Sequence, residues 1–258
     1  MSAADASDFS LDAYRRLLGA FAARDYRVVG FDGVDPTSRH LVLRHDVDIS
    51  LTLAVALAEV EHEMGYASHY FVLVTCEQYN PASQDGRDAL ARIVSLGHRI
   101  GLHFDAALET DTPLVERAAS EAAYLSALTG APVSMLSFHR PARQWIDNPA
   151  SLAGLPHSYQ PRFFSAMGYC SDSRGGWWHG APLDHDAVKS GSALQLLTHP
   201  AWWVESDRPP PARLANHLDQ RRAALARTRS SAATRGSGKA RSCSRWQGSW
   251  PTPTSECS

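Results

Sequence analysis

The sequence lacks long apolar segments, cysteine pairs and nucleotide-binding loops. None of its apolar runs approaches the roughly 20 residues that a membrane-spanning helix needs. The polar N-terminus has neither the basic start nor the apolar stretch of a signal peptide, so we expect a cytoplasmic protein without a membrane span. The four cysteines form no C-x-x-C pair, which argues against a disulfide scaffold and a cysteine-based zinc site. No glycine-rich phosphate loop follows an apolar run, and a net charge of −2 does not indicate a nucleic-acid-binding surface.

The sequence does contain enough apolar residues for one sizeable globular domain. Of its 258 residues, 44% are hydrophobic and 20% are charged. Short apolar runs alternate with segments of helical period, which is typical of parallel βα units. We expect strands at 26–30, 40–48, 68–76, 99–105, 132–141, 169–173 and 193–200, and helices at 10–21, 50–64, 85–96 and 113–129. Six or seven such strands favour a barrel-like α/β fold, and an open doubly wound sheet is the alternative.

The C-terminal part of the chain has a different composition. Residues 213–225 still have the pattern of an amphipathic helix, but residues 226–258 contain no Leu, Ile, Val, Met or Phe and only one acidic residue, Glu256. Such a segment cannot bury enough apolar surface to fold. We therefore expect a folded domain at 1–225 and an unfolded tail at 226–258. Because the change is abrupt, our hypothesis is that the tail is an out-of-frame reading of the true C-terminus.

Four of the expected strands end on charged or imidazole side chains. These are His45, Asp46 and Asp48 after the second strand, His103 and Asp105 after the fourth, His139 and Arg140 after the fifth, and His199 after the last. In a parallel α/β fold the carboxyl ends of the strands meet at one face. We therefore expect these side chains to converge although they lie far apart in the sequence.

Asp46 and Asp48 lie two residues apart beside His45. Two uncompensated carboxylates this close would repel each other, and a divalent cation would relieve that repulsion. Imidazole and carboxylate ligands suit zinc and other first-row metals, and a catalytic site commonly has three protein ligands and a position for water. A second carboxylate outside the ligand set can act as general base. The alternative is an ordinary exposed turn, where aspartate is common.

The ordered set of motifs resembles the polysaccharide-deacetylase family. The resemblance rests on the segments 45–48, 100–105, 137–141 and 196–200, and it covers about residues 25–205. It is greatest to the branch found among biosynthesis proteins for O-antigen, capsule and other cell-surface polysaccharides. The resemblance implies a single-domain, distorted (β/α) barrel of the seven-strand type. It also implies metal-assisted hydrolysis of an N-acyl group on a carbohydrate, which would be a polysaccharide precursor, a sugar nucleotide or a lipid-linked sugar.

The resemblance further implies roles for individual residues. Asp46 matches the general base, while Asp48 and His103 match metal ligands, with zinc as the expected ion. His199 matches the acid that protonates the leaving amine, and Arg140 matches an arginine that orients the base carboxylate.

The sequence departs from the family's pattern at two points. Val47 separates two aspartates that are adjacent in the family, and Ala107 stands where a second metal-binding histidine is usual. We therefore expect His139 to be the third ligand, with Asp105 and His45 as alternatives.

Asp172 follows a further apolar run and is a candidate partner for His199. A carboxylate beside an imidazole favours the protonated ring, so Asp172 would keep His199 ready to donate a proton. The alternative is an aspartate that only shapes a turn.

Three functions fit these observations. The first is metal-dependent removal of an acyl group from an amino sugar. The second keeps the metal centre but acts on a non-sugar amide, because fold alone does not decide the substrate. The third is a catalytically degenerate relative that binds or assembles, which the missing histidine at position 107 would favour.

Overall fold

The computed structural model describes residues 9–204, 209, 212–223 and 226. The chain divides after Leu214 into two units, and the fold and the site described below belong to the first. Residues 212–223 are helical, in agreement with the helix expected there. The expected tail at 226–258 lies, except for Ala226, outside the described residues and stays a prediction. None of the described helices is long and apolar enough to cross a membrane.

Seven parallel strands form the framework of the first unit. In chain order its elements are α1 (Leu11–Ala22), β1 (Arg27–Val28), β2 (His40–Val47), α2 (Leu51–Glu63), β3 (His69–Leu73), α3 (Gln84–Ser95), β4 (Arg99–Phe104), α4 (Leu114–Thr129), β5 (Leu136–Phe138), η2 (Arg143–Trp145), β6 (Gly168–Ser171), η3 (Pro182–Asp184), α5 (Asp186–Ser190), β7 (Leu194–Thr198) and α6 (Pro200–Val204). All the strands expected from the sequence are present, although several are shorter than expected.

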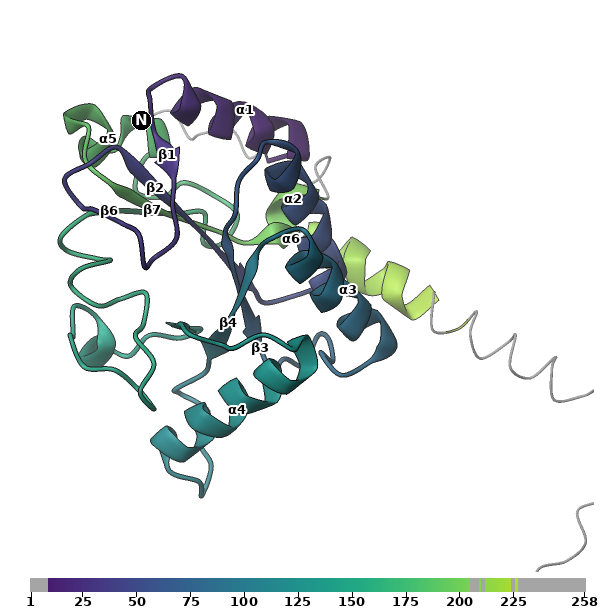
Figure 1. Ribbon diagram of the computed structural model, residues 1–258. Helices are drawn as coiled ribbons and strands as arrows, with labels where there is room; N and C mark the ends of the chain where they lie inside the picture. Colours follow the sequence, from purple (N-terminus) through teal and green to yellow (C-terminus); the bar gives the residue numbers. More distant parts are fainter. Residues whose placement is uncertain (1–8, 205–208, 210–211, 224–225, 227–258) are drawn as a thin grey trace, which may run out of the picture. The chain divides into compact units, whose positions relative to one another are not determined.

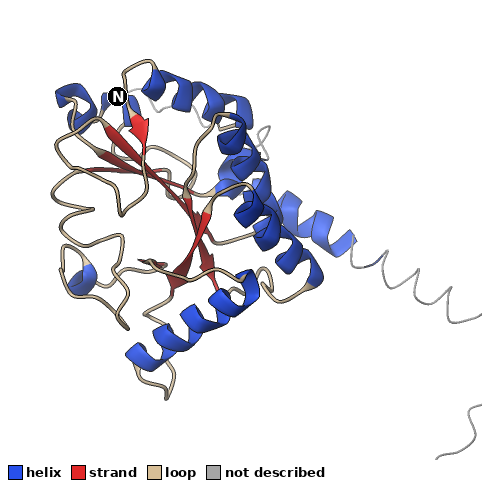
Figure 2. Ribbon diagram, in the orientation of Figure 1, coloured by secondary structure: helices blue, strands red, loops and turns tan. Residues whose placement is uncertain are grey.

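The sheet curls into a half-barrel. Its strand order is β5-β4-β3-β2-β7-β6, with β1 paired to the start of β2, and every pairing is parallel. Helices α1 to α4 cover the outer face, while loops make up the opposite side (Figures 1 and 2). The expected distorted (β/α) barrel is thus confirmed. An open doubly wound sheet would carry helices on both faces.

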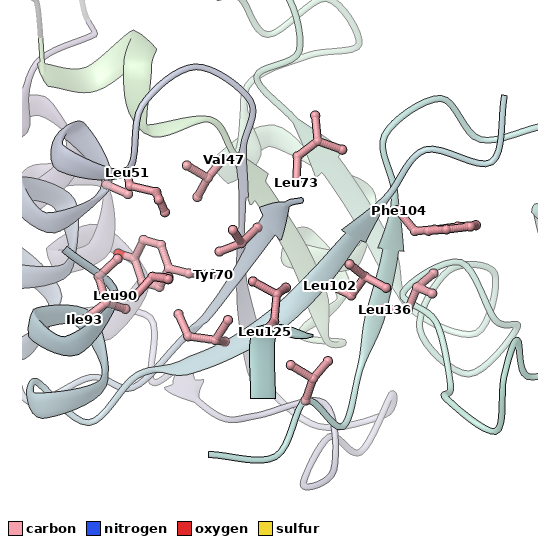
Figure 3. Packing of buried hydrophobic residues seen from close by; sticks show 14 of the residues in the cluster. Val47, Leu51, Tyr70, Leu73, Leu90, Ile93, Leu102, Phe104, Leu125 and Leu136 are labelled. Carbon is pink, nitrogen blue, oxygen red and sulfur yellow. The ribbon is translucent and has the colours of Figure 1, made fainter. Parts of the chain in front are cut away.

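Alternating residues of β2 face opposite sides of the sheet, as strand geometry requires. Leu41 and Leu43 pack outward with α1 and α2, whereas Val42 joins Phe31 and Phe71 inside the barrel. A second outer cluster joins β3 and β4 to α2 and α3 (Figure 3). Continued along β2, this alternation turns Arg44 and Asp46 into the barrel, and it turns His45 toward the helices.

Local signals in the sequence set most helix ends. Ser10 and Ser50 cap α1 and α2 by accepting hydrogen bonds from backbone N–H groups two or three residues into the helix. Gly130 ends α4 at a φ of 69°, a conformation that glycine adopts without strain. The position before the helix is Pro113, and no side chain caps it.

The segment 139–167 between β5 and β6 departs from the expected alternation of strands and helices. It contains only the short η2 helix. Its residues extend the barrel wall instead, because the N–H of Leu136 donates to the carbonyl of Pro156 and the N–H of Ser158 donates to the carbonyl of Leu136. Phe163 then fills the interior beside Phe31. This segment therefore covers the barrel on the side that the sheet leaves open.

Candidate metal centre

Three ligand atoms meet at the carboxyl ends of β2, β4 and β5. Oδ1 of Asp48 lies 3.0 Å from Nε2 of His103 and 3.3 Å from Nδ1 of His139. The two imidazole nitrogens are themselves 3.3 Å apart. The three residues are a group that could hold a metal ion, and His103 is buried while the other two are half-buried. The structure thus brings together the three residues that the sequence indicated as ligands.

Ser137 fixes which nitrogen of His103 is free. Its hydroxyl donates to Oδ1 of Asp46 at 3.2 Å, so its oxygen accepts a hydrogen bond from Nδ1–H of His103 at 2.6 Å. With the proton on Nδ1, the lone pair of Nε2 points toward Asp48 and His139. Metal-binding histidines commonly donate their second ring N–H in this way, which sets the tautomer and the ring orientation.

The geometry of the three atoms fits a divalent cation. Ligands at about 2.0–2.1 Å from a tetrahedral ion lie about 3.3–3.4 Å from one another, and the three separations of 3.0–3.3 Å are close to this. Oδ1 of Asp48 is buried and accepts no hydrogen bond. A buried carboxylate oxygen without a donor is costly unless a cation compensates it. The donor set of one carboxylate and two imidazoles suits zinc and other first-row metals.

Asp46 lies beside this triangle as a separate, ionised carboxylate. Nε of Arg44 donates to its Oδ1 at 3.0 Å and Nη2 donates to its Oδ2 at 2.7 Å, while Oδ2 lies 3.7 Å from Nε2 of His103. Burial by itself would raise the pKa of Asp46, but the charge and hydrogen bonds of the Arg44 guanidinium outweigh it and lower the pKa below its usual value. Asp46 is therefore ionised and can accept a proton.

His199 approaches from the other side, at the end of β7. Its Nε2 lies 3.6 Å from Oδ2 of Asp48, and its Nδ1 lies 2.6 Å from Oδ1 of Asp172. Asp172 is fully buried and also accepts from the indole N–H of Trp203 at 2.7 Å. Burial lowers the pKa of His199, but the charge and hydrogen bond of Asp172 outweigh it and raise the pKa to about 9. His199 thus holds a proton at neutral pH and directs Nε2 toward the metal triangle.

Arg140 does not orient Asp46, contrary to the role implied by the resemblance. Its guanidinium binds Asp105 instead, with Nε 3.1 Å from Oδ1 and Nη2 2.5 Å from Oδ2. Arg44 makes the contact to Asp46. The pairing with Arg140 also separates Asp105 from the ligand triangle, so Asp105 is not an alternative ligand.

His45, the other alternative ligand, lies on the opposite face of the sheet. Its ring is fully buried and contacts Glu61 and Thr198 rather than Asp48. The alternation of side chains along β2 explains this placement, because His45 follows Arg44 and precedes Asp46. The same alternation would have revealed Arg44 in the sequence, since it lies two residues before Asp46 and shares its face.

A small hollow lies between the loops that follow β2 and β7. Its volume is about 10 Å³, which is space for roughly one water-sized group. Its lining is Asp46, Val47, Asp48, Ile49, Ser50, His199, Pro200, Ala201 and Trp202. The hollow is therefore next to the base, one ligand and the acid at the same time.

The fold resembles solved carbohydrate esterases and deacetylases. A family 4 carbohydrate esterase from Bacillus anthracis is 17% identical with a TM-score of 0.42, covering 81% of this chain and 86% of its own. The chitin deacetylase of Colletotrichum lindemuthianum is 14% identical with a TM-score of 0.41, covering 70% and 81%. A CE4 family pseudoenzyme from Bacillus anthracis is 12% identical with a TM-score of 0.40, covering 72% and 63%.

These likenesses do not decide the reaction of this chain. No protein-family model and no curated protein matches its sequence. The matched structures include both enzymes and a pseudoenzyme, at identities of 12–17%. The geometry of the site carries the functional conclusion instead.

Proposed function

We propose that this chain is a metal-dependent hydrolase of the polysaccharide-deacetylase type, which removes an N-acyl group from an amino sugar or a polysaccharide precursor. The observation that carries the proposal is the ligand triangle of Asp48, His103 and His139 with a base and an acid on two sides of it. Amide hydrolysis needs a base that accepts a proton from water and an acid that donates a proton to the leaving amine, both close to the same carbonyl carbon.

Asp48, His103 and His139 would hold the cation, with zinc as the expected ion. When bound, such a cation supplies Lewis acidity to the acyl carbonyl and lowers the pKa of water. The chain's own contribution is to fix the three ligand atoms before binding. Ser137 does this for His103, since its 2.6 Å contact holds the proton on Nδ1.

Asp46 would accept the proton of the attacking water. Its carboxylate is ionised, and Arg44 donates one hydrogen bond to each of its oxygens. The bidentate contact holds the carboxylate plane in one orientation. The water oxygen forms a bond to the acyl carbon, and its proton passes to the carboxylate of Asp46.

His199 would donate the proton that lets the amine leave. Asp172 binds Nδ1, so the second ring proton is on Nε2, which faces the triangle. As the C–N bond breaks, this proton passes to the nitrogen of the sugar amine. The products are a free amine and a carboxylic acid. Asp46 then releases its proton to solvent and His199 takes up a proton from solvent, which restores both side chains.

The hollow beside the site favours a small acyl group. A volume of about 10 Å³ between Asp48 and Trp202 accommodates roughly one water-sized group, such as the methyl of an acetyl group. We therefore propose acetyl as the acyl group. The cytoplasmic location and a sugar-nucleotide or lipid-linked substrate stay predictions.

Acetate release from purified protein tests the proposal. The protein is stripped of metal, reloaded with one equivalent of zinc and incubated with N-acetylated sugars, chito-oligosaccharides and small acetamides. We expect acetate from the sugars only with the reloaded protein. Release from the acetamides alone would favour the non-sugar amide hydrolase. A protein that holds zinc and releases acetate from none of them would contradict the proposed activity.

A further inference from the structure

A buried network centred on Glu61 lies behind the sheet, on the face opposite the ligand triangle. Oε1 of Glu61 accepts from the hydroxyl of Tyr14 at 2.6 Å and lies 2.7 Å from Nε2 of His45. Oε2 accepts from the hydroxyls of Ser68 at 2.6 Å and Tyr70 at 2.8 Å. Glu61 and His45 are both 0% exposed. Four donors thus bond one fully buried carboxylate, two on each oxygen.

Glu61 is ionised in this network. Burial would raise its pKa, but the nearby His45 and the hydrogen bonds outweigh it and lower the pKa to about 2. An ionised carboxylate only accepts hydrogen bonds, so Nε2 of His45 carries a proton. The ring is held further by Tyr70, which stacks on it with ring centroids 4.4 Å apart. Tyr14 of α1, Glu61 of α2 and Tyr70 of β3 together set the orientation of the His45 ring.

The other nitrogen of His45 connects the network to β7. Nδ1 lies 2.7 Å from Oγ1 of Thr198. His45 and Thr198 are also register partners, and theirs is the last backbone pair between β2 and β7. Both side chains are fully buried. The contact thus joins the two strands at the point where they separate into the loops that carry the site.

The next residues along the two strands are the base and the acid. Asp46 follows His45, and His199 follows Thr198. We propose that Glu61, His45 and Thr198 form a positioning relay that fixes the end of β7 against the end of β2, and so sets the distance between His199 and the pair Asp46 and Asp48. This inference rests on the proposed function and adds a group of residues that never touch substrate.

The relay resembles a carboxylate–imidazole–hydroxyl triad in its order and contacts, but its surroundings exclude a nucleophilic role. Thr198 is fully buried, on the face of the sheet against which α1 and α2 pack. No substrate atom can reach it without unfolding that layer. The relay therefore acts through the strands, as positioning residues.

Replacing Thr198 tests the relay with the least disturbance. Thr198→Val keeps the shape of the side chain and removes only the hydroxyl, whereas Thr198→Ser keeps the hydroxyl. A displacement of reacting groups by a fraction of an ångström to 1 Å lowers kcat by about 10- to 100-fold. We expect a loss of that size in Thr198→Val with KM and bound zinc unchanged, and recovery to within a few-fold of the wild type in Thr198→Ser. Thr129→Val is the matched control, because its hydroxyl bonds backbone carbonyls at the end of α4, away from the site.

A crystal structure of Thr198→Val provides a readout that does not depend on activity. We expect the 3.6 Å separation between Nε2 of His199 and Oδ2 of Asp48 to increase in this variant and to be retained in Thr198→Ser. If the wild type shows no turnover, the proposed function fails while this distance still tests the relay. An unchanged distance in Thr198→Val, or equal kcat values for the Val and Ser variants, would overturn the relay.

Discussion

Asp46 is a carboxylate with 4% of its side chain exposed, and one arginine binds both of its oxygens. The resemblance to the polysaccharide-deacetylase family indicated Asp46 as the base, and its place at a strand end beside a second carboxylate fits that role. The arginine that binds Asp46 was not indicated correctly. The motif order pointed to Arg140, whereas Arg44 lies inside an apolar strand and belongs to no motif. Only the inward alternation of β2 identifies Arg44. A search of strand ends therefore finds the reacting side chains, such as Asp46, more readily than the side chains that bind and orient them, such as Arg44.

Replacing Arg44 by Met should leave Asp46 buried without a counter-charge. Removal of one partner from a buried ion pair costs about 3–5 kcal/mol, so we expect a loss of this size in the free energy of unfolding at pH 7. The pKa of Asp46 is lowered in the folded protein, so the pair contributes stability above the unfolded value of 3.8 and loses it as the pH falls. Urea unfolding at pH 7 and at a pH well below 3.8 measures both effects. Equal stability of the variant and the wild type at pH 7 would contradict the pairing.

Replacing Asp172 by Asn should lower the pKa of His199. Burial lowers the pKa of His199, and its raised value of about 9 results mainly from Asp172, with smaller contributions from Asp48 and Asp46. The charged ring contributes stability in full below pH 6.5, and this contribution is lost as the pH rises through about 9. An NMR titration of the His199 ring in metal-free protein measures the shift. An Asn variant that titrates like the wild type would show that Asp172 does not hold the proton on His199.

At the scale of elements, strands and most helices follow directly from the sequence pattern. The apolar runs that predicted β2, β4 and β7 also placed His103 and His199 at strand ends. The segment 139–167 was not predictable in this way, because it has no periodic apolar pattern and its residues are held by single contacts to β5 and to the barrel interior. Contacts between distant segments leave no local signal.

Gly101 tests how tightly the barrel interior is packed. A Cβ at this position in β4 would lie 2.5 Å from the ring of Phe71, so we expect Gly101→Ala to lower the free energy of unfolding by about 1–3 kcal/mol. Gly19 is the matched control, because a Cβ there meets nothing within 4 Å and the residue lies within α1. Gly19→Ala should raise stability by about 0.5–1 kcal/mol. Similar destabilisation by both substitutions would argue against a close-packed interior.

In the whole molecule, a bound cation would link the carboxyl ends of β2, β4 and β5 directly to one another, in addition to the backbone pairing of the sheet. Its ligands come from β2, β4 and β5, and the acid comes from β7. Binding to the folded state alone should therefore stabilise the whole first unit. Zinc at 100 times its dissociation constant should raise the free energy of unfolding by about 2.7 kcal/mol. Thermal unfolding with and without zinc measures this, and His139→Ala should abolish the effect. A zinc response that persists in His139→Ala would remove His139 from the ligand set.

Asp48 is proposed to hold the metal, and Asp46 is proposed to act as the base. Elemental analysis of zinc in the purified wild type, Asp48→Ala and Asp46→Ala tests these roles most directly. We expect about one zinc per chain in the wild type and in Asp46→Ala, and almost none in Asp48→Ala. A wild type without near-stoichiometric metal, or an Asp48→Ala variant that retains it, would contradict the account.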